Sequence, residues 1–191
     1  MDAGIGGAQE RNVPSKVKIS MTATATATAT SLNSWTTQDR IAAQRKCVDQ
    51  HVALENAHEV EQVISETFAT EGVYYDVVPG MAHFDGLGGI AYFYDLLFRV
   101  LPDIHIKMTH EYDVPGYSIR EGVVTGTHSA EFAGVPASGN TVVFPFCGIY
   151  IFGDDPTRLI AERAYWDNDG VGRQMRGEST AGADMPWHKT K

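Results

Sequence analysis

Residues 142–167 read VVFPFCGIYIFGDDPTRLIAERAYWD, with two long β-type runs on either side of a turn at residues 153–156. In the first run, apolar side chains occupy both sets of alternating positions, which is typical of a strand covered on both faces. In the second run, alternation places Glu162 and Trp166 on one face and Tyr165 on the other. The stretch therefore predicts two antiparallel strands at the centre of a sheet.

The sequence before these strands divides into a helical part and a strand-rich part. Apolar residues recur at helical spacing in the first part and alternate with polar residues in the second. The expected elements are helices at residues 37–54, 60–68 and 86–100, a short strand at 73–78, and long strands at 104–109 and 117–132. Helices that precede a run of antiparallel strands indicate the α+β class. We expect a cone-shaped half-barrel, in which three N-terminal helices and a curved antiparallel sheet enclose a pocket.

Both ends of the chain differ in composition from this predicted domain. Residues 22–30 alternate Thr and Ala, and such small side chains bury too little apolar surface to offset the entropy lost on ordering. We therefore expect residues 1–35 to be a disordered low-complexity tail and residues 36–176 to form the domain. Residues 177–191, rich in Gly and polar residues, are expected to be a loose C-terminal tail.

The charge and the cysteines exclude several classes of function. Lys and Arg number 15 against 24 Asp and Glu, which gives a formal net charge of −9. Nucleic acids and anionic membrane surfaces attract basic proteins, so neither is an expected partner. No apolar run reaches the roughly 18 residues of a membrane-spanning helix. Cys47 and Cys147 lie far apart in the sequence, which favours reduced thiols in a cytoplasmic protein.

Motifs for metal, nucleotide and nucleophile chemistry are absent from the sequence. It has no clustered His, Cys and carboxylate residues at ligand spacing, no Walker or dinucleotide-binding glycine loop, and no GxSxG elbow. We therefore expect no metal and no cofactor. Any chemistry would come from an acid, a base and a shaped apolar pocket.

Asp167 and His128 are the candidates for that chemistry. Asp167 ends an apolar strand beside Trp166, where desolvation would raise the pKa of its carboxyl and suit it to general acid or base catalysis. Alternatively, Asp167 caps the following turn or pairs with Arg163. His128 lies between small residues in a β-type run, where it either contacts a ligand or is a hydrogen-bonded structural histidine.

Aromatic residues and one histidine are the candidates for the pocket wall. His105 alternates with apolar neighbours, so it faces either the pocket or solvent. The expected substrate-binding residues are Tyr75, Tyr94, His105, Phe146, Tyr165 and Trp166. Because the strand at 142–152 is apolar on both faces, we expect its outer face to be covered by a second copy of the chain, which predicts a homodimer.

Three segments resemble the SnoaL-like polyketide cyclases, a family in the nuclear-transport-factor-two-like superfamily that also contains ketosteroid isomerase. Residues 126–139, GTHSAEFAGVPASG, resemble the family signature GTHxGxFxGxPPTG, with Ala130 in place of its Gly and PASG in place of PPTG. Residues 160–175, IAERAYWDNDGVGRQM, are similar to the family's ending, in which Glu, Trp-Asp and Gln recur at these spacings. Residues 98–103, FRVLPD, resemble its FPD helix end.

The resemblance implies ring closure by intramolecular aldol condensation, with an acidic residue as general acid and base and without a cofactor. By position, Asp167 would move the proton beside a carbonyl and His128 would hydrogen-bond the carbonyl oxygen. The expected function is a cyclase or isomerase of a small hydrophobic carbonyl compound. Because one scaffold serves many functions, the alternatives are a non-catalytic ligand-binding or dimerisation module, a dehydratase, or an epoxide hydrolase, for which Arg163 and Asp167 supply part of the required set.

Overall fold

The structure is a computed structural model that describes residues 35–178. The two predicted tails lie outside the described residues except for their inner ends, residue 35 and residues 177–178. No helix in the described part of the chain is long and apolar enough to cross a membrane.

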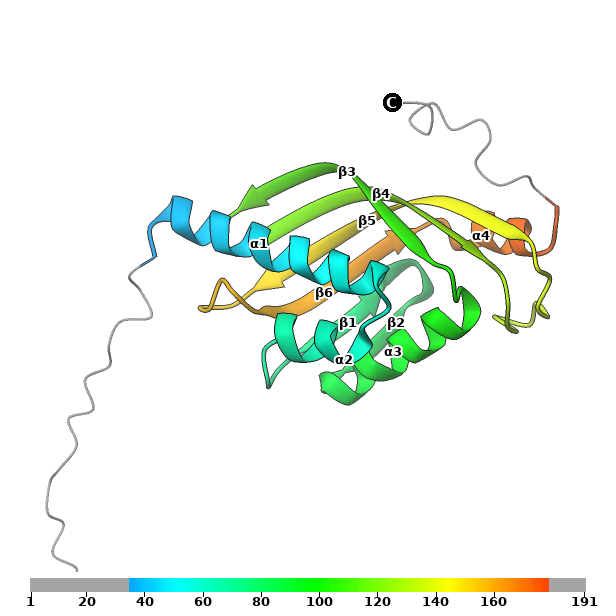
Figure 1. Cartoon of the computed structure of the whole chain (residues 1–191), viewed down its shortest axis with the longest axis horizontal. Helices are drawn as coiled ribbons and strands as arrows, with labels where there is room; N and C mark the ends of the chain where they lie inside the picture. Colours follow the sequence, from blue (N-terminus) through cyan, green and yellow to red (C-terminus); the bar gives the residue numbers. More distant parts are fainter. Residues whose placement is uncertain (1–34, 179–191) are drawn as a thin grey trace, which may run out of the picture. The chain divides into compact units, whose positions relative to one another are not determined.

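A curved, unclosed sheet of six strands forms the body of the domain, in the order β2-β1-β6-β5-β4-β3 (Figure 1). Neighbouring strands are antiparallel except for the parallel pair β1 and β6. The strands are β1 Tyr74–Val77, β2 Ala82–Asp85, β3 His105–Val114, β4 Tyr117–Thr127, β5 Thr141–Phe152 and β6 Leu159–Trp166.

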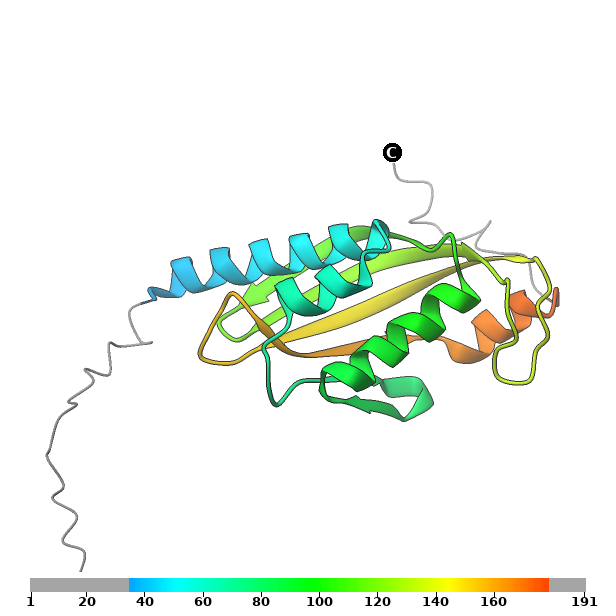
Figure 2. The ribbon, with the colours of Figure 1, turned by 60° about the horizontal axis from the view of Figure 1, so that its bottom comes forward.

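Three helical segments cover one face of this sheet, as Figure 2 shows from below. A further helix, α4, follows the end of β6 and packs against β5. The helical elements are α1 Thr37–Asn56, α2 Val60–Gln62, the π-helical turn η1 Val63–Thr67, the short turn η2 Val78–Gly80, α3 Gly86–Val100 and α4 Asn168–Met175. The inner sheet face and the helices bury the apolar core between them.

Side-chain caps and amide pairs place α1 against the sheet. Thr36 caps the helix, since its hydroxyl oxygen accepts a hydrogen bond from the Asp39 backbone N–H at 3.1 Å. At the other end, Asn56 donates to the carbonyl of Ile106 at 3.0 Å and accepts from its N–H at 2.7 Å. Gln44, fully buried, bonds to three backbone groups of the β3–β4 turn. The helix is therefore held to the sheet at Gln44 and at its C-terminal residue, Asn56.

The α+β prediction is confirmed, including the three N-terminal helices and the four long strands. Two elements differ from it. Strand β2, which pairs with β1, was not expected, because four residues are too few to show a clear alternation. Residues 168–170 were expected to form a turn, and they begin helix α4 instead, whose two glycines hide its helical pattern in the sequence.

Candidate active site

A cavity of about 500 Å³ opens between α3, the loop after β4 and helix α4. Its wall is almost entirely apolar, and Leu96, Phe132, Val135, Trp166 and Met175 are among the side chains that form it. The polar side chains in the wall belong to Asn168, Asp169 and Arg176. A cavity of this size and composition suits a small hydrophobic molecule.

A second cavity of about 50 Å³, here called the inner chamber, adjoins the first. The two cavities are neighbours because four side chains line both: Phe93, Leu97, Phe144 and Trp166. Unlike the large cavity, the inner chamber is lined by two carboxyl groups and two phenols, those of Glu55, Glu162, Tyr75 and Tyr150. The pocket therefore has a wide apolar part and a narrow polar end.

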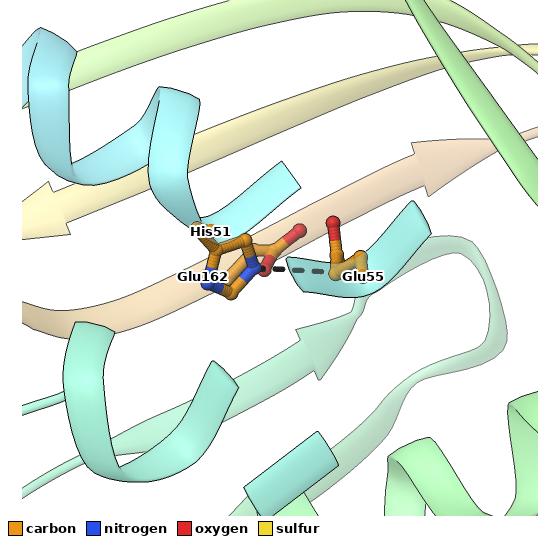
Figure 3. A group of neighbouring side chains, drawn as sticks. All are labelled: His51, Glu55 and Glu162. Carbon is orange, nitrogen blue, oxygen red and sulfur yellow. Dashed lines mark ion pairs between the residues drawn. The ribbon is translucent and has the colours of Figure 1, made fainter. Parts of the chain in front are cut away.

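Glu55 and Glu162 of the chamber wall form a buried group of ionisable side chains with His51, which does not line the chamber (Figure 3). Helix α1 supplies His51 and Glu55 one turn apart, and β6 supplies Glu162. The imidazole Nε2 of His51 lies 3.0 Å from Glu162 Oε2 and 3.4 Å from Glu55 Oε1. All three residues are at least 97 % buried, so the charges interact with little screening by water.

Neighbouring hydroxyl groups define the protonation state of His51. Thr67 donates its hydroxyl proton to the carbonyl of Val63, so its oxygen accepts from His51 Nδ1, 2.8 Å away. Tyr94 donates to Glu55 Oε1 at 2.9 Å, so its oxygen accepts from His51 Nε2, 3.1 Å away. Both ring nitrogens then carry protons, and His51 is a buried cation.

Electrostatics supports this assignment. Burial lowers the pKa of His51, but the two neighbouring carboxylates outweigh it and raise that pKa to about 10. Burial raises the pKa of the Glu162 carboxyl, with Glu55 adding to the effect, although hydrogen bonding to His51 opposes it. Burial also raises the pKa of the phenols of Tyr75, Tyr94 and Tyr150, so these groups stay neutral.

These three residues also have the composition of a metal site. Their ring nitrogen and two carboxylate oxygens lie within 4.8 Å of one another. Because both nitrogens of His51 already serve as donors, a metal ion would have to displace a proton from Nε2. The three residues are far apart in the sequence, and α1 and β6 bring them together from opposite ends of the domain.

The structure places Asp167 at the N-cap of α4. Its Oδ1 accepts from the Gly170 N–H at 3.0 Å, which confirms the capping interpretation, and the side chain is exposed. Asp167 itself does not line either cavity, but the next two residues line the large one. Arg163 does not pair with Asp167 and instead contacts Asp76 at 3.2 Å.

His128 is fully buried at the end of β4, where the loop of residues 128–140 begins. Its Nδ1 lies 3.0 Å from the hydroxyl of Ser138 in the same loop. Its Nε2 is buried and has no hydrogen-bond partner within the described residues. His128 lines neither cavity, whereas Phe132 and Val135 of this loop line the large one.

The expected substrate-binding residues separate according to strand alternation. Tyr75, Phe146 and Trp166 line the inner chamber, and Trp166 also lines the large cavity. Tyr94 lies behind the chamber, bonded to Glu55. His105 pairs with Thr125 and Tyr165 pairs with Cys147, and these positions alternate with chamber-lining ones, so both side chains lie on the outer sheet face.

The sequence did contain two signals for the missed residues. His51 and Glu55 are four apart in a helix, so they share a face, and that face also contains the buried Val48 and Val52. Glu162 lies on the same face of its strand as Trp166, the apolar face. A charged residue among buried apolar ones needs a partner of opposite charge. His51 on the helix and Glu162 on the strand are such partners for each other.

Comparison with known proteins supports one family. A family model described as SnoaL-like polyketide cyclase matches residues 45–175. No curated protein matches the sequence.

Solved structures share the fold. A candidate SnoaL-like polyketide cyclase from Jannaschia sp. CCS1 has a TM-score of 0.63 at 18% identity, over 71% of this chain and 93% of that one. A candidate polyketide cyclase from Acidithiobacillus ferrooxidans has a TM-score of 0.59 at 19% sequence identity, and the match covers 72% of this chain and 96% of that one. AclR, a candidate hydroxylase from Streptomyces galilaeus, has a TM-score of 0.61 at 14% sequence identity, and the match covers 72% of this chain and 98% of that one. Identities this low show that the fold is shared and do not show the activity.

Proposed function

Because the chain belongs to the SnoaL-like polyketide cyclase family, we propose that it is a cyclase-type enzyme that acts by general acid–base chemistry, without a cofactor, on a small hydrophobic carbonyl compound. The observation that carries the proposal is the apolar cavity of about 500 Å³ that narrows to a chamber lined by carboxyl groups. The wide part would hold a hydrocarbon skeleton and exclude water. The narrow end would hold the carbonyl group, next to the carbon that loses a proton.

Asp167 is the proposed base of this reaction. It would take a proton from the carbon next to the carbonyl, and the pair of electrons would form the enolate that attacks in ring closure. Its place immediately before two cavity-lining residues supports this role. His128 as the hydrogen-bond donor to the carbonyl oxygen stays a prediction, as does the cytoplasmic location.

Filling the cavity should weaken ligand binding. Leu96 lies on α3 and lines the large cavity, so Leu96→Trp would occupy the space of the substrate. We expect this variant to bind α-tetralone, an apolar cyclic ketone, at least roughly tenfold more weakly than the wild type in calorimetry, because a lost contact of about 1.4 kcal/mol changes affinity tenfold. Tyr92→Trp is the matched control, since Tyr92 is on the same helix and exposed. Equal affinity of the Leu96→Trp variant would place the ligand elsewhere.

We also propose a homodimer through the outer sheet face. Within residues 35–178, no helix packs on this face, which presents Ile119, Pro145, Cys147, Ile149 and Ile151 in neighbouring strands. The apolar side chains along β5 lie between Glu121 of β4 and Arg163 of β6, and such a row favours covering by another protein surface.

A lysine at the centre of this face should break the dimer. Ile149→Lys would bury an unpaired charge in the interface, so we expect a monomer by light scattering where the wild type is a dimer. Tyr92→Lys, on a helix of the opposite face, should stay dimeric. A monomeric wild type would contradict the proposal.

A further inference from the structure

The buried cluster of His51, Glu55 and Glu162 has an unbalanced charge and two oxygen atoms without partners. His51 carries one positive charge, and the two glutamates together carry two negative charges when both are ionised. Within the described residues, Oε2 of Glu55 and Oε2 of Glu162 are buried and accept no hydrogen bond. Both conditions are costly in a protein interior, so a further positive charge beside these oxygens would stabilise the cluster.

Each side chain of the cluster has one polar atom held by a hydroxyl group outside it. Nδ1 of His51 donates to the hydroxyl oxygen of Thr67 at 2.8 Å. The Oε1 atoms of the two glutamates accept hydrogen bonds from phenols, at 2.9 Å from Tyr94 to the glutamate of α1 and at 3.2 Å from Tyr75 to that of β6. Outer hydrogen bonds of this kind orient the ligands of metal sites. They leave Nε2 and the two Oε2 atoms as ligand atoms for a further group.

The cluster is compact enough for a single metal ion. A ring nitrogen and one oxygen of each carboxylate lie within 4.8 Å of one another, and His51 Nε2 is 3.0 Å from Glu162 Oε2, which therefore points into the cluster. Ligand atoms of one zinc ion, each about 2.0–2.2 Å from it, are about 3–4 Å apart, so small side-chain movements suffice. One imidazole with two carboxylates suits Zn²⁺, whereas Mg²⁺ and Ca²⁺ prefer oxygen ligands alone.

A divalent ion also balances the charge. On binding, the Nε2–H bond of His51 breaks, the proton goes to solvent, and the nitrogen lone pair binds the ion. One neutral imidazole, two carboxylates and one Zn²⁺ then sum to zero. A single proton on Glu55 or Glu162 would also give zero, but only the ion accepts electron pairs from both Oε2 atoms at once. The unpartnered oxygens therefore favour the ion over the proton.

We propose that His51, Glu55 and Glu162 bind one Zn²⁺ ion, which links helix α1 to strand β6. The site is structural, because its side chains are at least 97 % buried and structural zinc sites are closed, whereas catalytic ones keep a position open for water or substrate. The hydroxyl of Tyr94, 3.1 Å from Nε2, is at hand for the fourth position. The proposed acid–base chemistry does not use this ion, so the inference goes beyond the proposed function and does not depend on it.

Zinc content tests the site directly. The full chain is freed of metal with a chelator, incubated overnight with a small excess of zinc chloride, desalted and measured by mass spectrometry of the elements. The wild type should retain one zinc ion per chain, and Glu162→Gln should retain none, because a neutral amide is a poor zinc ligand. Glu121→Gln is the matched control, since it removes the carboxylate of an exposed pair with His110 and should keep the ion.

A change outside the ligands gives a second measurement, which holds whatever the stability of Glu162→Gln. Thr67→Val keeps the shape of its side chain but removes the oxygen that accepts from His51 Nδ1. We expect its zinc affinity, measured by competition with a chelator, to be lower by roughly tenfold or more. Because the ion binds the folded chain, zinc should also raise the melting temperature of the wild type and leave that of Glu162→Gln unchanged.

Three results would overturn the inference: a wild type without bound zinc, a Glu162→Gln variant that retains the ion, or an unchanged zinc affinity in Thr67→Val. The first would mean that a proton balances the buried charge, and the second that zinc binds at another place on the chain. Binding of α-tetralone tests the proposed function separately, so the failure of one proposal is distinguishable from the failure of the other.

Discussion

Asp167→Asn should slow turnover by roughly 100-fold or more, the contribution of a general base, and leave the fold intact. The amide cannot accept the proton from the carbon beside the carbonyl. It can still accept the hydrogen bond from Gly170 N–H that starts α4, because Asn caps helices about as well as Asp. Turnover is measured as deuterium exchange at the carbon next to the carbonyl of α-tetralone in heavy water.

Asp167→Ala separates the two roles of this residue. It should lose turnover to the same extent and also lose about 1 kcal/mol of stability through the missing cap. If Asp167→Asn keeps the wild-type rate and only Asp167→Ala is affected, Asp167 is a structural cap and the base lies elsewhere.

Arg120→Ala should reduce the free energy of unfolding by about 3 kcal/mol, the lower end of the range for a broken buried ion pair, because the buried carboxylate of Asp113 loses one cation and keeps Arg45. Arg120 is 2% exposed and its guanidinium lies 2.8 Å from the carboxylate of Asp113, whose side chain is buried to the same extent. Denaturant unfolding measures the change. Arg173→Ala, at an exposed ion pair on α4, is the control and should change stability by less than about 1 kcal/mol.

The pH dependence of this pair has a definite sign. Burial opposes ionisation of Asp113, but hydrogen bonds from Ser118, Arg120 and Arg45 hold its pKa below the usual value. A lowered folded-state pKa adds stability above the unfolded pKa of about 3.9, and this is lost as the pH falls through the folded value. On acidification, the Arg120→Ala variant should lose less folding stability than the wild type loses. An equal loss in both proteins would contradict this account of the pair.

Local patterns predicted most of the fold. The alternation in residues 142–167 and the helical spacing before residue 100 correspond to β5, β6 and the first three helices. The misses have local causes as well: β2 is too short to show a period, and the two glycines of α4 mask a helix that Asp167 caps. The parallel pairing of β1 with β6 depends on tertiary contacts, which no local pattern contains.

Less of the candidate site could be predicted from the sequence. Alternation correctly separates Trp166 from Tyr165, yet it cannot say which face is inner without the positions of the helices. The cluster of His51, Glu55 and Glu162 forms only when α1 packs on the sheet and brings its two residues beside Glu162 of β6, more than a hundred residues later in the chain. His51 looks like an ordinary helix residue in the sequence, because its role comes from the two carboxyl groups that the fold brings beside it.

Deuterium exchange of α-tetralone with the wild-type protein shows whether the cavity is a site for proton transfer beside a carbonyl. NMR follows the loss of the proton signal at the carbon next to the carbonyl. We expect exchange faster than in buffer with the wild type and with Tyr92→Trp, and exchange at the buffer rate with Leu96→Trp. Exchange at the buffer rate with the wild type, or an unchanged rate after the cavity is filled, would contradict it.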